Sequence, residues 1–146
     1  TIELTDSRVS ISSINTGVPH VVIVKDRIDD VDIVKLGREI RYHDRFSPAG
    51  TNVNFVCHIK ENNIAIRTYE RGVEDETLAC GTGAAAGAII MAHEINLYSP
   101  ISVLTRSGEY LNIFYKEKEG QYYDIYLEGD ARIIYKAQLW KEAWKE

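Results

Sequence analysis

The first part of the chain alternates between short apolar runs and turn-forming stretches. Two apolar runs, Ile11–Ile14 and Val21–Val24, are separated by Asn15–His20, which is rich in residues that favour turns. Runs of this length between turn residues predict strands. The stretch Asp29–Tyr42 differs, because its apolar residues recur every three or four positions. That spacing predicts a helix, capped by one of its two leading aspartates.

Two longer alternating stretches follow the chain break at Ser47–Gly50. In Thr51–Lys60 and Asn63–Tyr69, every second side chain is apolar or small, which predicts two strands. The polar residues between them predict a hairpin turn. Strand character returns near the end of the chain, where we expect strands at Ile101–Thr105, Tyr110–Glu117, Tyr122–Glu128 and Ala131–Ala137, followed by a frayed tail at Trp140–Glu146.

The stretch Gly81–Asn96 predicts a helix of another kind. Its residues are mostly Ala, Gly, Ile and Met, so it has almost no polar face. A helix that is apolar all round is buried on all sides. We therefore expect an α+β domain over residues 1–146, in which a mostly antiparallel or mixed sheet wraps around this central helix.

Composition and charge narrow the class of protein. The chain has 146 residues, 45% of them hydrophobic and 27% charged, which fits one globular domain. A net charge of −5 gives no basic surface for nucleic acid or an anionic membrane. The longest small or apolar run, Gly83–Ala92, is too short to span a bilayer. Two cysteines form no disulfide framework, and the four histidines lack zinc-site spacing, so we expect reduced thiols, no metal and a cytoplasmic protein.

Cys80 is the residue with the strongest indication of chemistry. It stands directly before the predicted helix, in Leu78-Ala79-Cys80-Gly81-Thr82-Gly83. The first amides of a helix have no partner within the helix and favour an anion. A thiol at such a position has a pKa below the value of about 8.5 of free cysteine. The alternative is a small buried cysteine without chemistry, and the glycines alone are weak evidence for an anion site.

Three segments together resemble one enzyme family. Tyr69-Glu70-Arg71-Gly72 and then Ala79-Cys80-Gly81-Thr82-Gly83-Ala84 resemble the second signature of the diaminopimelate epimerase family. Gly17-Val18-Pro19-His20 resembles the family's Gly-Asn-Pro-His segment, and Gly50-Thr51-Asn52-Val53-Asn54-Phe55 resembles its asparagine-containing strand. The matches occur in the family's order and cover most of residues 15–95.

The resemblance implies half of a two-domain enzyme. Family members carry one cysteine per domain at the start of a central helix, and the two cysteines act on opposite faces of the substrate Cα. One thiolate removes the proton and the other thiol delivers one, so the configuration inverts without pyridoxal phosphate, metal or other cofactor. The implied reaction interconverts LL- and meso-2,6-diaminopimelate in the synthesis of lysine and peptidoglycan precursors. The implied ligand is therefore a small-molecule amino-acid substrate.

The resemblance also assigns roles by position. Cys80 is implied as one acid/base, Glu70 as the glutamate that tunes its protonation, and His20 as the partner of the other cysteine. Arg71 and Asn52 are implied to bind the distal end of the substrate, and Glu70 is also implied to contact the substrate. The α-carboxylate is implied to lie on the backbone amides of Gly81 and Thr82. Each also has a plain structural alternative, namely a surface charge pair for Glu70 and Arg71, a strand-end cap for Asn52, and a turn residue for His20.

Two departures from the family pattern matter. Val18 stands where the family has an asparagine, so one substrate contact is left unassigned. No second Cys-Gly-x-Gly segment is present, and Cys57 lies in a strand pattern typical of packing. We therefore expect the chain to be the carboxy-terminal half, inactive alone, with a separate or missing amino-terminal domain as partner; a homodimer is also open. A proline-racemase-like enzyme and a non-catalytic amino-acid-binding or interaction domain are the alternative functions.

Overall fold

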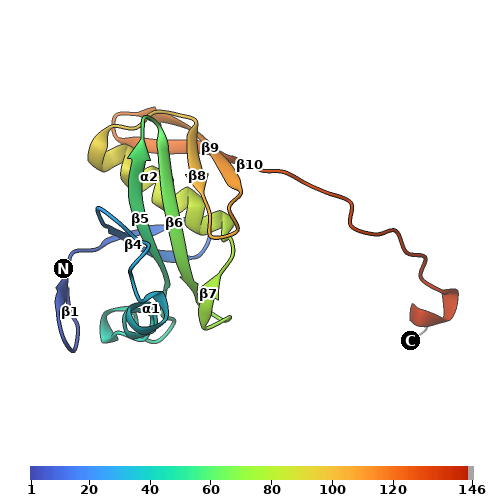
Figure 1. Ribbon diagram of the computed structural model, residues 1–146, viewed down its shortest axis with the longest axis horizontal. Helices are drawn as coiled ribbons and strands as arrows, with labels where there is room; N and C mark the ends of the chain where they lie inside the picture. Colours follow the sequence, from blue (N-terminus) through green and yellow to red (C-terminus); the bar gives the residue numbers. More distant parts are fainter. Residues whose placement is uncertain (145–146) are drawn as a thin grey trace.

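The computed structural model describes residues 1–144, and within them one curved sheet dominates (Figure 1). Its strand order is β10-β9-β8-β6-β5-β4-β3, with β7 paired to β6. A separate two-stranded sheet joins β1 (Ile2–Glu3) and β2 (Arg8–Val9). The strands of the main sheet are β3 (Ser12–Asn15), β4 (Pro19–Val24), β5 (Asn52–Lys60), β6 (Asn63–Glu70), β7 (Asp75–Thr77), β8 (Ile101–Leu104), β9 (Tyr110–Lys118) and β10 (Gln121–Glu128).

Both parallel strand pairs of the sheet are joined through a helix. β4 pairs in parallel with β5, and α1 (Ile33–Arg41) lies between them in the chain. β6 pairs in parallel with β8, and α2 (Gly81–Ile95) lies between those. Parallel neighbours require such a crossover, whereas the other pairs are antiparallel and follow turns. The expected α+β class with a mostly antiparallel, mixed sheet is confirmed.

The two helices cover opposite faces of the sheet. Val53 and Phe55 of β5 pack on the α1 side, whereas Val56 of the same strand packs against α2. This is the two-residue alternation that the sequence predicted. α2 contacts strands along most of the sheet, from β3 to β10, and nine of its residues are buried. Gly87 allows this close approach, because a Cβ there would lie 3.1 Å from Cγ2 of Val56. The expected buried central helix is confirmed.

Two expectations for local structure are wrong. The cap of α1 is Asp32, whose side chain accepts a hydrogen bond from the amide of Lys35 at 3.0 Å, and not one of the earlier aspartates. Residues 131–137 are not a strand; they run away from the body (Figure 1), no strand among residues 1–144 pairs with them, and Ile133 is 94% exposed. Alternating side chains make a strand only where another strand supplies hydrogen bonds.

The end of the chain also differs from the expected frayed tail. Lys141–Trp144 form one turn of 3₁₀ helix, and residues 145–146 lie outside the described part of the chain. Across residues 1–144, neither helix is long and apolar enough to cross a membrane.

Candidate active site

Cys80 is the N-cap residue of α2. Its backbone is extended, its carbonyl accepts the first helical hydrogen bond from Ala84 at 2.8 Å, and its side chain makes no capping hydrogen bond. The thiol is half-buried and free. The first amides of α2 therefore have no side-chain acceptor at this position, and together with the helix dipole they favour a thiolate or a bound carboxylate here.

Gly83 is required by the packing beneath Cys80. A Cβ at this position would lie 2.5 Å from Oδ1 of Asn54 and 3.2 Å from Sγ of Cys80. The first turn of α2 can therefore approach β5 only because residue 83 has no side chain. This contact brings the thiol close to a cluster of buried polar residues.

That polar cluster centres on His20. The ring is 1% exposed, with Nε2 3.0 Å from Oγ1 of Thr82 and Nδ1 3.0 Å from Nδ2 of Asn54. Thr82 Oγ1 is in turn 3.6 Å from Sγ of Cys80. Burial lowers the pKa of His20 from 6.5 to about 4, and the positive charge of Arg71 acts in the same direction. His20 is therefore a neutral, hydrogen-bonded ring beside the helix start and not a free turn residue. Its role as the partner of the other cysteine stays a prediction.

Asn52 joins the site to the loop that carries Arg71. Its Oδ1 accepts a hydrogen bond from the amide of Arg71 at 2.8 Å, and its Nδ2 donates to the carbonyl of Pro19 at 3.3 Å. The Arg71 guanidinium donates to the carbonyl of Ala49 at 3.1 Å and remains half-buried. Asn52 thus fixes the backbone from which the predicted carboxylate-binding cation extends. Its own contact with a substrate stays a prediction.

Glu70 is the last residue of β6, next to Arg71. Its backbone pairs with Asp75 of β7 and accepts a hydrogen bond from Glu74 at 2.8 Å. Within residues 1–144, no hydrogen bond or ion pair joins its half-buried carboxylate to Cys80. Its role in tuning the thiol remains a prediction.

Cys57 lies apart from this site. It is half-buried on β5 and packs with the hydrophobic cluster on the α1 side, opposite to α2. Burial raises the pKa of its thiol, which disfavours a nucleophilic or basic role. The expected packing role of Cys57 is confirmed.

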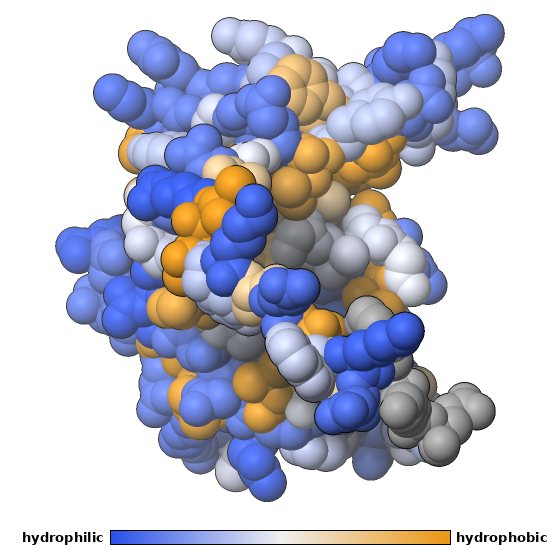
Figure 2. Space-filling view, turned by 90° about the vertical axis from the view of Figure 1, so that its right-hand side faces the viewer, coloured by the Kyte–Doolittle hydropathy of each residue, from blue (hydrophilic) through white to orange (hydrophobic). Residues whose placement is uncertain are grey.

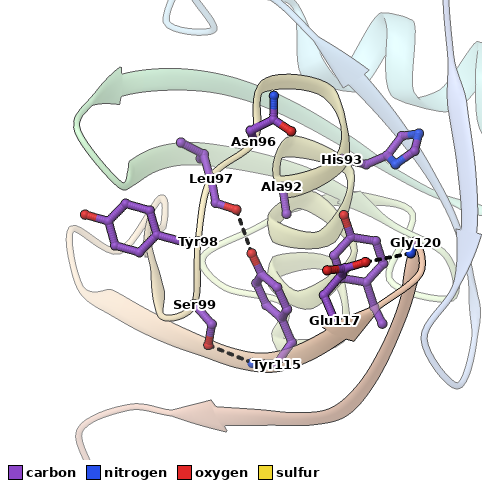
Figure 3. Close-up of a pocket in the computed structure, with 10 residues that line it drawn as sticks. Ala92, His93, Asn96, Leu97, Tyr98, Ser99, Tyr115, Glu117 and Gly120 are labelled. Atoms are coloured by element: carbon purple, nitrogen blue, oxygen red, sulfur yellow. Dashed lines mark hydrogen bonds between the residues drawn. The ribbon is translucent and has the colours of Figure 1, made fainter.

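A hollow of about 490 Å³ lies at the start of α2, where Gly81 follows Cys80. Gly81 and Thr82 of α2 line it together with Thr16 and Gly17 of the loop before β4, and with Leu127 of β10. A pocket of about 590 Å³ lies instead at the other end of α2 (Figure 3). There the hydroxyl of Tyr115 donates to the carbonyl of Leu97 at 2.7 Å. That pocket contains none of the predicted site residues, so its size does not mark the site.

Two site residues were missed from the sequence. Asn54 is fully buried and contacts both His20 and Thr68, while the hydroxyl of Thr68 donates to Oδ1 of Asn54 at 3.0 Å. The available signal was two asparagines at alternate positions, 52 and 54, in an otherwise apolar strand. An Asn on the core-facing side of a strand requires buried hydrogen-bond partners.

Most of the chain matches known proteins in sequence. The family model described as diaminopimelate epimerase matches residues 12–134. The chain is 48% identical over 130 residues to the diaminopimelate epimerase of Aquifex aeolicus, covering 88% of this chain and 46% of that protein. The corresponding enzyme of a Hydrogenobaculum species is 46% identical over 130 residues, covering 86% and 45%. The chain therefore spans about half the length of the curated relatives it matches.

Solved structures support the fold independently. A phenazine biosynthesis protein of the PhzF family from Enterococcus faecalis aligns with a TM-score of 0.53 at 18% identity, covering 69% of this chain and 35% of that one. A predicted epimerase from Pseudomonas aeruginosa gives 0.53 at 15%, covering 70% and 34%. Fold and sequence together define a domain of the epimerase type with a cysteine at a helix start. The chain belongs to the diaminopimelate epimerase family.

Proposed function

We propose that this chain is the carboxy-terminal half of an amino-acid epimerase that interconverts LL- and meso-2,6-diaminopimelate. The supporting observation is Cys80 as the uncapped N-cap of a buried helix, at residues matched by the family model. In this proposal the Cys80 thiolate takes the Cα proton, or its thiol returns one, on one face of the substrate. The chemistry needs no bound cofactor, because the thiol itself carries the proton.

The first turn of α2 supports binding of the substrate α-carboxylate. Gly81 and Thr82 line the hollow at the start of α2, and the side chain of Cys80 makes no capping hydrogen bond, so the first amides of the helix remain open to a carboxylate. Amide N–H groups that hold the carboxylate stabilise the negative charge that develops on it as the Cα proton leaves, which makes this proton easier to remove. Arg71 supplies a planar cation for a second carboxylate, and Glu70 an adjacent anion for the distal ammonium group.

A second cysteine-bearing half is the proposed partner. Inversion requires a proton donor on the face of Cα opposite to the base, and the other cysteine of this chain, Cys57, is on the wrong side of the sheet. On the face of the molecule shown in Figure 2, hydrophobic side chains are exposed between hydrophilic ones. Exposed apolar residues near the end of the chain offer a surface for such a half; they include Ile125, Leu127, Ile133, Ile134, Tyr135 and Trp140. Two free thiols support a reducing compartment such as the cytoplasm.

The partner is tested by reconstitution. The chain is assayed for epimerisation of LL-diaminopimelate alone and after fusion behind the amino-terminal half of the Aquifex aeolicus relative. We expect turnover only in the fusion, because each half provides one of two acid/base groups. Full turnover by the 146-residue chain alone would contradict the two-half account.

The substrate is tested with Arg71→Met in the same fusion. A distal carboxylate needs a cation, so we expect KM for diaminopimelate to rise by about 10- to 100-fold, since a charged hydrogen-bond pair is lost. The Arg38→Met variant, in the last turn of α1, is the control and should leave KM unchanged. Racemisation of proline by the fusion, with no activity on diaminopimelate, would favour the proline-racemase-like alternative.

A further inference from the structure

The amide of Asn54 has one orientation that satisfies its neighbours. Its Nδ2 lies 3.0 Å from the carbonyl oxygen of Val21, which can only accept, so this end must be the NH₂ group. Its Oδ1 then accepts the hydroxyl hydrogen of Thr68 at 3.0 Å. Both residues are buried, with exposed fractions of 0% for Asn54 and 3% for Thr68. The second N–H of Asn54 points to Nδ1 of His20 at 3.0 Å.

This orientation determines the tautomer of His20. Because Nδ1 accepts from Asn54, a neutral ring carries its proton on Nε2. Nε2 is 3.0 Å from Oγ1 of Thr82, so the ring donates and the Thr82 oxygen accepts. The Thr82 hydroxyl hydrogen is then directed away from His20. Its other neighbour is Sγ of Cys80, at 3.6 Å.

We propose that Thr68, Asn54 and His20 act as positioning residues that aim the Thr82 hydroxyl proton at Cys80 and stabilise the Cys80 thiolate. Each group donates to the next, from Thr68 to Asn54, from Asn54 to His20, and from His20 to Thr82. The last donor reaches sulfur. A hydrogen bond to the charged form favours that form, and aligned hydrogen bonds strengthen one another. The catalytic role of this thiolate rests on the proposed function. The stabilisation of the thiolate does not, because it is measured without substrate.

The test is the rate of iodoacetamide alkylation of Cys80 between pH 5 and pH 10. Trypsin separates the two cysteines into residues 46–60 and 72–106, so mass spectrometry follows Cys80 with Cys57 as an internal standard. The variants are Thr82→Val, which removes the last donor, and Thr68→Val, which removes the first. Both keep side-chain volume and net charge, so a shifted pH profile reports the hydrogen bonds.

The chain offers a matched control for each variant. Thr77 lies directly opposite Thr68 in the β6–β7 pair, and its hydroxyl has no hydrogen-bond partner within residues 1–144. Thr77→Val therefore makes the same change in the same strand pair without removing a hydrogen bond from the chain of donors. Thr82→Ser restores the hydroxyl at residue 82. Thr82 is exposed, so Thr82→Val folds even if a buried substitution does not.

We expect Thr82→Val to lower the alkylation rate of Cys80 near neutral pH by about tenfold and Thr68→Val by about threefold, with the profile midpoint moved to higher pH. Thr77→Val and Thr82→Ser should follow the wild-type profile. A Thr68→Val profile identical to the wild type, or an equal shift in Thr77→Val, would overturn the proposal. Either result leaves the proposed epimerase function untouched, because that function is tested separately, by substrate turnover in the fusion.

Discussion

His20 gives the sharpest thermodynamic prediction, because it is buried and hydrogen-bonded as a neutral ring. Its pKa is lowered to about 4 in the folded chain by burial, against 6.5 for an ordinary histidine. Between these values the unfolded chain binds a proton that the folded chain does not. The free energy of unfolding therefore falls as pH drops from 6.5 to 4. Each pKa unit is worth 1.36 kcal/mol, so His20 alone contributes about 3 kcal/mol of this loss.

The assay is urea unfolding at pH 7 and pH 4, followed by circular dichroism, for wild type and His20→Gln. The carboxylates titrate in both proteins, so their effect cancels in the comparison. We expect the stability lost between the two pH values to be about 3 kcal/mol smaller in His20→Gln. His93→Gln is the control, because His93 is exposed in the last turn of α2, and it should behave like the wild type.

Equal acid losses in wild type and His20→Gln would refute the reasoning. That result would mean that His20 takes up a proton in the folded protein as readily as in the unfolded chain. His20 would then not be a buried ring that resists protonation in the folded chain.

Three further substitutions test the packing around the site. Thr77→Val removes a buried hydroxyl without a partner among residues 1–144, so thermal unfolding should show a gain of about 1 kcal/mol. Gly83→Ala places a Cβ 2.5 Å from Oδ1 of Asn54, and urea unfolding should show a loss of about 1 to 3 kcal/mol, together with slower alkylation of Cys80. Arg67→Met breaks a two-pronged ion pair with Glu76, at 2.7 and 2.8 Å, and should cost about 3 kcal/mol by the same measurement. A loss in Thr77→Val, or no loss in the other two, would contradict these contacts.

The sequence predicted the main elements well where one face of an element is buried. β5 and β6 alternate because one side meets α1 and the other meets α2. α2 lacks a polar face because strands surround it. In these segments the pattern of apolar residues and the tertiary environment agree, so the local prediction holds.

The misses occurred where the deciding partner lies elsewhere in the chain. Residues 131–137 alternate like a strand, but no neighbouring strand pairs with them within the described residues. Asp29, Asp30 and Asp32 all precede α1, and in the folded chain Asp32 occupies the N-cap position.

The candidate site divides in the same way. Cys80 was found from its local setting at a helix start, which depends on neighbours in sequence. Asn54 and Thr68 were missed, because their role depends on the register of β5 against β6 and on the approach of α2. His20 and Thr82 are 62 residues apart, and only the folded chain brings them to 3.0 Å.

The central claim is that Cys80 transfers the Cα proton. The most direct measurement is inversion at Cα and exchange of the diaminopimelate Cα hydrogen in heavy water, by the fusion of the two halves and by its Cys80→Ser and Cys57→Ser variants. We expect Cys80→Ser to reduce inversion by about 10²- to 10⁴-fold, the usual contribution of a positioned acid/base, together with exchange in the epimer whose Cα hydrogen faces Cys80, and Cys57→Ser to retain both. Exchange and inversion that survive unchanged in Cys80→Ser would contradict the account.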